Sequence, residues 1–324
     1  MESRAGEQVP ARPGHPRSVL GLRSQGSTST RKFGTQNRAA YIFLAPWLVG
    51  FFVLTLGPMV ASLYLSFTNY ELFTAPKWIG IENYHRMFFE DRRFAQALQV
   101  TSTYVLLSVP LKLIFALSVA MILNRGIRGL GIYRSIYYLP SLLGGSVAVA
   151  IMWRQICSHN GLGNQLLEKI GMKGPSWISS PDYALHTLVI LAVWQFGSPM
   201  VIFLAGLKQI PQDIYDASAI DGAGRWAQLF KITIPLLTPI IFFNLVMQII
   251  GSFQAFTSAF IVSGGTGGPA DSTLFYTLYL YQRGFTEFDM GYASAMAWVL
   301  LAIIAGSTAV AFLSSKYWVH YDDC

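Results

Sequence analysis

Long runs of hydrophobic residues, separated by shorter polar segments, dominate the pattern along this chain. Six runs reach or exceed the ~18 residues that a helix needs to cross a hydrocarbon core about 30 Å thick. A backbone inside hydrocarbon must satisfy its own hydrogen bonds, and the runs lack the alternation of a membrane β-barrel, so helices are predicted. The predicted spans are Ala40–Leu65, Ala97–Leu123, Ile136–Trp153, Leu185–Leu207, Leu236–Val262 and Ala293–Leu313.

Composition agrees with this pattern. Hydrophobic residues make up 53% of the chain and charged residues only 12%, which excludes an ordinary soluble domain. We therefore predict an all-α membrane protein, a polytopic bundle of six transmembrane helices over residues 39–315. Residues 1–38 are rich in Ser, Gly, Arg, Pro and Gln, which is typical of a disordered tail, and residues 316–324 form a short C-terminal tail.

Basic residues are distributed unevenly among the segments that connect the spans. Fourteen Lys and Arg fall on one side of the predicted membrane and eight on the other, while Lys112 lies inside a span. Because positive residues concentrate on the cytoplasmic side, both termini and segment 208–235 are predicted to be cytoplasmic. The net charge of +7 thus indicates orientation in a lipid bilayer, and nucleic acid is not expected as a partner.

Segment 208–235, between the fourth and fifth spans, carries the signals of a helix-turn-helix. Pro211 suits the start of a helix, and Asp213 and Asp216 place carboxylates near its positive N-terminal end. Gly222 can adopt the positive φ of a sharp turn at the end of this helix. Residues at i, i+3 and i+6 form one small apolar ridge along it: Ile214, Ala217 and Ile220.

A second helix is predicted to begin around Gly224 and to end at Pro235. Apolar residues recur along it with helical spacing, which predicts an amphipathic stripe that faces the bundle. The members of this stripe are Trp226, Leu229, Phe230 and Thr233.

The spacing within this segment resembles a known pattern. Asp216-Ala217-Ser218 is followed after three residues by Gly222, and after nine more by Ile232-Thr233-Ile234-Pro235. This resembles the EAA loop of ABC-transporter permeases, although Asp216 replaces Glu and Ser218 replaces the second Ala of the family pattern. The resemblance implies that a separate ATPase subunit docks here, on Asp213, Asp216, Ala217, Ser218, Ala219, Asp221, Gly222, Ala223, Gly224 and Pro235.

Further segments resemble sugar-type, binding-protein-dependent permeases in the same order along the chain. They favour the maltose F-type or glycerol-phosphate A-type half over its shorter partner half. These segments are Trp78–Tyr84, Tyr133–Pro140, Gly264–Thr273 and Gly291–Ala297.

This family implies half of the translocation pathway of an ATP-driven importer for a sugar or sugar-like solute, in a bacterial or archaeal cytoplasmic membrane. The implied partners are a second homologous permease subunit, two nucleotide-binding ATPase subunits and an extracytoplasmic solute-binding protein. The sequence contains no G-x-x-x-x-G-K-[ST] phosphate loop. ATP and Mg²⁺ are therefore expected on the ATPase, and this chain is predicted to bind no cofactor and to be no enzyme.

Polar side chains inside the predicted spans are candidates for the solute pathway. A charge such as Lys112 costs at least ~2.5–3.5 kcal/mol at mid-membrane, so it is expected to face a cavity or to bond to carbonyls near the Pro110 kink. The other candidates, in and after the fifth span, could bind sugar hydroxyls or join helices to each other. They are Asn244, Gln248 and Ser252, at i, i+4 and i+8, with Gln254 and Ser258.

An ion-coupled secondary transporter of small polar solutes is the alternative function. It predicts paired carboxylates or broken helices at mid-membrane, but the six predicted spans contain no Asp or Glu. The histidines show no metal-ligand spacing, so no metal site is expected. Cys157 and Cys324 are predicted to be free thiols on opposite sides of the membrane.

Overall fold

The structure is a computed structural model that describes residues 33–125 and 129–320, with side chains from residue 41 onward. The chain divides into two compact units, Met1–Leu56 and Gly57–Cys324. Helices account for about 75% of the described residues. Residues 1–32 of the predicted tail, and Cys324, lie outside the described residues.

The described part of the first unit is an apolar helix. Helix α1 (Phe33–Gly50) continues into the π-helical turn η1 (Phe51–Leu56). Its start at Phe33 lies inside the segment predicted to be a tail. Trp47 and Phe51 stack with ring centroids 5.5 Å apart.

The second unit begins with helix α2 (Gly57–Ser66) and a short antiparallel hairpin, β1 (Thr68–Asn69) and β2 (Lys77–Trp78). The hairpin is a small departure from the predicted all-α class. Helix α3 (Glu82–His85) and the turn η2 (Arg86–Glu90) follow. The buried Asn83 holds this region together, because its amide nitrogen donates to the carbonyls of Ser66 and Thr68, both at 2.9 Å.

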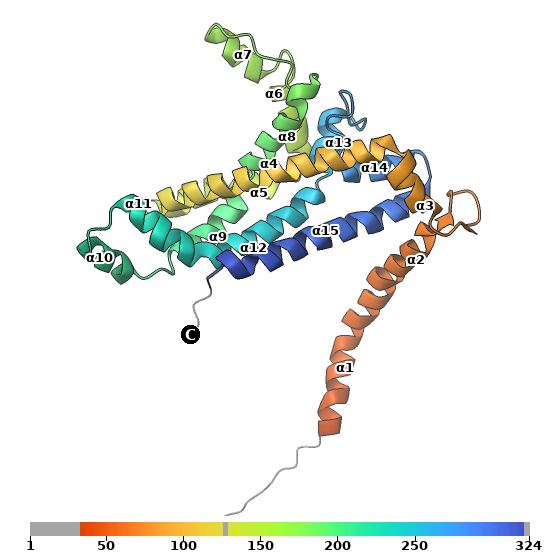
Figure 1. Cartoon of the computed structure of the whole chain (residues 1–324), viewed down its shortest axis with the longest axis horizontal. Coiled ribbons are helices and arrows are strands. Elements are labelled where there is room, and N and C mark those ends of the chain that lie inside the picture. The colour runs from red at the N-terminus through yellow and green to blue at the C-terminus, as the bar shows by residue number, and fades with distance from the viewer. Residues whose placement is uncertain (1–32, 126–128, 321–324) are drawn as a thin grey trace, which may run out of the picture. The chain divides into compact units, whose positions relative to one another are not determined.

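Helix α4 (Arg92–Leu123) is the central helix of this unit. It packs against α8, α9, α12 and α14, whose bounds are given below, and Figure 1 shows it beside α12. Three alanines on its packed faces have no exposed surface, and such small side chains let neighbouring helices approach closely. They are Ala97, Ala116 and Ala120.

The third predicted span is not one straight helix. It consists of α5 (Leu130–Leu143) and α6 (Val147–Ile156), which meet at an angle of 97°. The break falls at Gly144 and Gly145, where the backbone is least restricted, and Ser146 caps α6 by accepting from the Val149 amide at 3.4 Å. Helix α7 (Leu162–Lys169) follows α6.

The fourth predicted span is broken as well, into α8 (Pro181–Trp194) and α9 (Gly197–Leu207), which are bent by 42°. Pro199 explains the break, since it lacks the N–H that would bond to the Gln195 carbonyl. The two breaks meet, because the Gln195 side-chain amide donates to the Gly144 carbonyl at 3.1 Å. Gly197 is needed for this approach, as a Cβ there would lie 2.4 Å from the Tyr137 carbonyl oxygen.

The segment after α9 forms α10 (Gln212–Ile220), a turn, and a long helix from Arg225 to Phe253. The long helix comprises α11 (Arg225–Gln228), the π-helical turn η3 (Leu229–Thr233) and α12 (Ile234–Phe253). A break at residues 254–256 precedes α13 (Thr257–Ser263), so the fifth predicted span, drawn through to Val262, is too long.

The segment between the fifth and sixth predicted spans contains well-packed structure. Helix α14 (Tyr276–Tyr281) and the turn η4 (Gln282–Thr286) lead into α15 (Met290–Trp318). Five residues of this segment have 0% exposed surface, and they are among the most buried in the described chain: Leu274, Phe275, Tyr276, Leu278 and Tyr279.

Among the described residues, four helices are long and apolar enough to cross a membrane, and the number rises to six if each bent pair is one span. The four are Tyr41–Ser66, Arg92–Leu123, Arg225–Phe253 and Met290–Trp318. The chain is therefore a mostly helical protein with several apolar helices.

Candidate functional site

Helix α10 is the most exposed element of segment 208–235, the predicted coupling loop. None of its residues is buried. The predicted ridge faces outward, with Ile214 39% exposed and Ile220 88% exposed. Asp216 accepts a hydrogen bond from the Gln212 amide at 3.2 Å, and no ion pair forms on it or on Asp213 within residues 33–125 and 129–320.

The turn after α10 has the geometry of a Schellman motif. Gly222 adopts φ +81°, and a Cβ on it would meet no atom within 4 Å, so the requirement for glycine here is conformational. The Ala223 amide donates to the Ser218 carbonyl at 2.9 Å, and the Gly222 amide donates to the Ala219 carbonyl at 3.1 Å. This turn fixes the direction in which the chain leaves α10.

Side-chain hydrogen bonds fasten α10 to the start of the long helix. The Tyr215 hydroxyl lies 3.0 Å from the Thr233 hydroxyl. The Gln228 amide donates to the Ser218 hydroxyl at 2.9 Å and to the Tyr215 carbonyl at 3.2 Å. The sequence did not predict these roles for Tyr215 and Gln228. The one signal in the sequence was Ser218, whose hydroxyl replaces the family's alanine and accepts the bond from Gln228.

The second helix of the loop departs from the prediction in two respects. Pro235 does not end it, because η3 widens the turn just before this proline and α12 continues without a break. The predicted stripe is split by the same π turn. Thr233 is buried, whereas Trp226 and Phe230 are 73% and 61% exposed and stack with centroids 6.1 Å apart.

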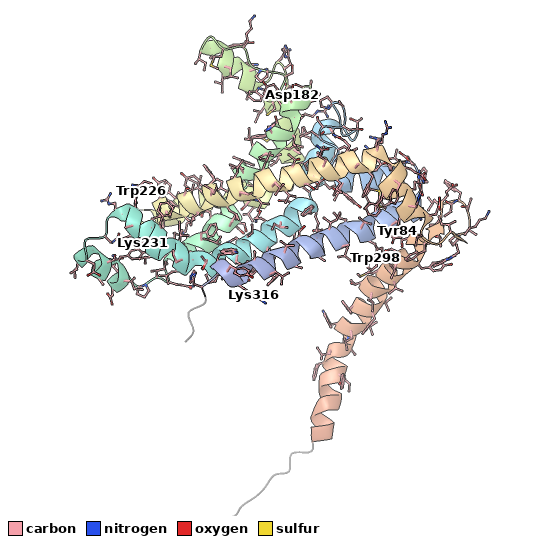
Figure 2. The ribbon with its side chains drawn as sticks, viewed as in Figure 1. Tyr84, Asp182, Trp226, Lys231, Trp298 and Lys316 are labelled. Atoms are coloured by element: carbon pink, nitrogen blue, oxygen red, sulfur yellow. The ribbon has the colours of Figure 1, made fainter. Side chains whose placement is uncertain are left out.

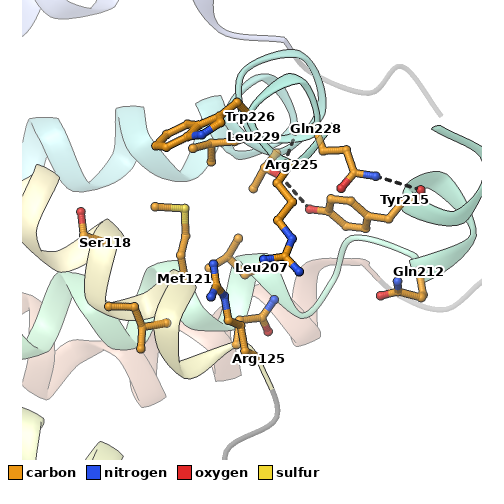
Figure 3. Close-up of a pocket in the computed structure, with 13 residues that line it drawn as sticks. Ser118, Met121, Arg125, Leu207, Gln212, Tyr215, Arg225, Trp226, Gln228 and Leu229 are labelled. Carbon is orange, nitrogen blue, oxygen red and sulfur yellow. Dashed lines mark hydrogen bonds between the residues drawn. The ribbon is translucent and has the colours of Figure 1, made fainter. Parts of the chain in front are cut away.

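A cleft of about 1040 Å³ lies between α10, the start of the long helix, and the C-terminal ends of α4 and α9. Figure 3 shows the Arg125 and Arg225 guanidinium groups extending toward each other across it. Most of the remaining wall is apolar, with Met121, Leu207 and Leu229 among its residues.

The predicted pathway residues do not form one surface. Asn244 is 1% exposed, and its amide donates to the Ile240 carbonyl at 3.1 Å, whereas Gln248 and Ser252 on the same helix are half-buried. The break after α12 separates these residues from the other two candidates, since Gln254 caps α12 and Ser258 lies on α13.

Lys112 is half-buried on α4. Its ammonium group donates no hydrogen bond and forms no ion pair within the part of the chain that the structure describes. The expected bonds from Lys112 to backbone carbonyls near the Pro110 kink therefore do not form here.

A second polar centre, which sequence reasoning did not find, lies at the end of the unit opposite α10. Asp91 is its hub: it accepts from the hydroxyls of Tyr279 at 2.5 Å and Tyr292 at 2.6 Å, and it pairs with Arg283 at 3.3 Å. We call these four residues the Asp91 cluster. It joins the start of α4 to α14, η4 and α15, which are about two hundred residues away in sequence.

The Asp91 cluster is only slightly exposed, with side-chain values of 6% for Asp91 and 17% for Arg283. Burial alone would raise the pKa of the Asp91 carboxyl, but hydrogen bonds from Tyr279, Tyr292 and the Phe94 amide, with the charge of Arg283, lower it overall. Burial and the hydrogen bond to Asp91 raise the pKa of the Tyr279 hydroxyl. Asp91 thus stays ionised and Tyr279 stays neutral at physiological pH.

Residues 89–318 match the family described as the binding-protein-dependent transport system inner membrane component. The probable ABC transporter permease protein YesP of Bacillus subtilis (strain 168) is 55% identical over 305 residues, covering 94% of this chain and 99% of that protein. The lactose transport system permease protein LacF of Rhizobium radiobacter is 32% identical, over 85% of this chain and 93% of its own.

The trehalose/maltose transport system permease protein MalF of Thermococcus litoralis is 30% identical, over 87% of this chain and 95% of its own. A similar fold occurs in a solved bacterial alginate ABC transporter in complex with an alginate pentasaccharide-bound periplasmic protein, with a TM-score of 0.75 at 20% identity. That similarity covers 87% of this chain and 95% of the solved one. By its family match and its relatives, this chain belongs to the inner membrane components of binding-protein-dependent transport systems, and it is a permease subunit, not an enzyme.

Proposed function

We propose that this chain forms half of the translocation pathway of an ATP-driven importer, and that α10 is the docking element for a separate ATPase subunit. One observation carries the proposal: α10 has no buried residue and yet is fastened at Tyr215 and Ser218. Its small residues allow close approach, and the exposed Ile220 offers apolar surface for a partner to bury. A fastened helix can also transmit a displacement to the long helix that begins at Arg225.

In the proposed topology, six spans cross the inner membrane and both termini lie in the cytoplasm. Each of the two bent helix pairs then counts as one span. Lys231 and Lys316 support this orientation, since they lie toward the end that carries α10 and α11 (Figure 2). The α10 end would therefore face the ATPase.

The proposed assembly contains a second homologous permease subunit, two ATPase subunits and an external solute-binding protein. Helix α5 supports the proposal of a second permease subunit, because none of its residues is buried although most of its side chains are apolar. Its exposed apolar surface includes Ile132, Ile136, Leu139 and Leu142. A second helical subunit would cover such a surface.

The proposed solute is a sugar or a sugar-like compound, because the named relatives carry lactose, trehalose or maltose. Gln248 and Ser252 are the strongest pathway candidates on α12, since both keep exposed surface and can hydrogen-bond to hydroxyl groups. Gln248→Ala should abolish uptake of the sugar that the binding protein retains, without loss of assembly. Unchanged uptake would remove Gln248 from the pathway.

One observation favours the alternative of an ion-coupled transporter: two predicted spans are broken helices, which such transporters also contain. It still lacks carboxylates in the spans, and it gives α10 no partner. Transport by the purified permease pair without an ATPase would favour it.

Co-purification tests the docking proposal. We expect Gly222→Val, which forces a β-branched residue into φ +81°, and Asp216→Arg to lose the ATPase subunit that wild type retains. The matched control is Glu168→Arg, at an exposed position of helix α7, which should retain the ATPase. Retention of the ATPase by both coupling-loop variants would contradict the proposal.

A further inference from the structure

The cleft beside α10 carries a positive charge to which the proposed docking of the ATPase assigns no role. Its lining residues include Arg125 and Arg225 but no Asp or Glu. Neither guanidinium forms an ion pair with any carboxylate in the described residues. Two like charges that point toward each other across a cleft repel, and an anion between them would remove the repulsion (Figure 3).

Most of the remaining surface of the cleft is apolar and continuous with the long apolar helices, although Ser118, Asn124, Gln212, Gln228 and Thr233 also line it. Met121 and Ile122 belong to the last turn of α4, and Leu207 ends α9. Ile122 is 57% exposed, so this wall is accessible from the side of the helix bundle. Free phosphate would gain nothing from such a wall, whereas acyl chains would bury apolar surface against it.

An exposed aromatic pair of the kind that favours the membrane surface lies at this cleft. Trp226 lines it and stacks on Phe230, and both rings are mostly exposed. Amphipathic Trp side chains concentrate where lipid headgroups meet the hydrocarbon. The pair lies on the first turns of the long helix that starts at Arg225, where a spanning helix would enter the headgroup region.

We propose that this cleft binds an anionic glycerophospholipid. Arg125 and Arg225 bind the phosphate from both sides, and the acyl chains lie along Met121, Ile122 and Leu229. Basic clefts between helices at a membrane surface bind anionic headgroups in this way. The assignment to the ATPase-side leaflet depends on the proposed function, whereas the binding itself does not.

Native mass spectrometry of the purified permease tests this site. The probes are palmitoyl-oleoyl phosphatidylglycerol and the zwitterionic phosphatidylcholine with the same chains. We expect wild type to retain the anionic lipid in preference, and the double variant Arg125→Gln/Arg225→Gln to bind it about 30-fold more weakly. Arg125→Lys/Arg225→Lys keeps the charge and should restore most of the binding, which separates lost charge from misfolding.

Lys169→Gln/Lys173→Gln, which removes two basic residues in and after α7, is the matched control and should bind like wild type. Equal retention of the two lipids by wild type, or equal binding of the anionic lipid by the Gln variant, would overturn the proposal. Co-purification of the ATPase, measured in parallel, separates the two ideas. If the Gln variant loses the ATPase and keeps the lipid, the cleft serves an acidic protein segment and the lipid site is wrong.

Discussion

The two ends of the second unit use their polar residues in opposite ways. At one end, the Asp91 cluster is nearly buried and joins four elements, with Asp91 6% exposed. At the other end, α10 carries the exposed carboxylates of Asp213 and Asp216, which form no ion pair within the described chain. The charged groups at the Asp91 end are paired within this subunit, whereas the carboxylates of α10 are exposed and can bind a partner.

This contrast separates stability from assembly. Buried pairs contribute little net stability when intact, but the loss of one partner leaves an uncompensated buried charge and is strongly destabilising. Exposed groups tolerate substitution, so changes on α10 should affect partner binding and leave the fold intact. The same type of mutation should therefore have different effects at the two ends.

The largest effect is expected for Asp91→Asn. Asparagine can still cap α4, but it leaves Arg283 with only the more exposed Glu287 as a counterion, which should destabilise the protein by about 3 kcal/mol. The melting temperature of the purified permease measures this. Asp271→Asn is the control: its pair with Arg93 at 3.0 Å is about one-third exposed, so a loss below ~1 kcal/mol is expected. Similar losses for the two variants would contradict the contrast.

Protonation of Asp91 at low pH should reproduce part of the destabilisation expected for Asp91→Asn. The folded-state pKa of Asp91 is lowered, so its contribution is fully present above the unfolded value of about 3.9 and is lost as the pH falls through the folded value. We expect the difference in melting temperature between wild type and Asp91→Asn to be constant from about pH 8 to 5 and to shrink below about pH 4. A difference that stays constant in strong acid would show that charge is not the cause.

The smallest effect is expected for Ser218→Ala, which restores the family's alanine and removes one acceptor of the Gln228 amide. The Gln228 bond to the Tyr215 carbonyl remains, so α10 should loosen by only about 0.5–1 kcal/mol. Amide hydrogen exchange in α10 should then be about two- to fivefold faster, with no change in melting temperature. Unchanged exchange would mean that Ser218 does not fasten α10.

Much of the fold could be predicted from the sequence because apolar runs of spanning length have few alternatives. The Schellman turn at Gly222 was equally accessible, since a positive φ strongly favours glycine. The helix breaks were not predicted, although Gly144-Gly145 and Pro199 lie at or next to them. Neighbouring helices decide whether such residues kink a span or interrupt it, as Gln195 does by bonding to Gly144.

The Asp91 cluster and the packing of α14 could not be predicted for another reason. Asp91 and Tyr292 are separated by 201 residues, and no local pattern connects them. Residues 274–281 form an apolar run too short to span a membrane, so they fall outside the predicted spans although they pack inside the unit. Such contacts depend on tertiary structure alone.

The most direct measurement of the central claim is thiol labelling at α10. Ala219→Cys, with Cys157 and Cys324 replaced by Ser, is exposed to a maleimide in the purified permease pair, before and after ATPase subunits are added. Docking predicts that labelling becomes at least about tenfold slower with the ATPase bound, while Leu166→Cys on α7 labels at the same rate in both states. Equal rates at Ala219→Cys in a complex that demonstrably contains the ATPase would contradict the account.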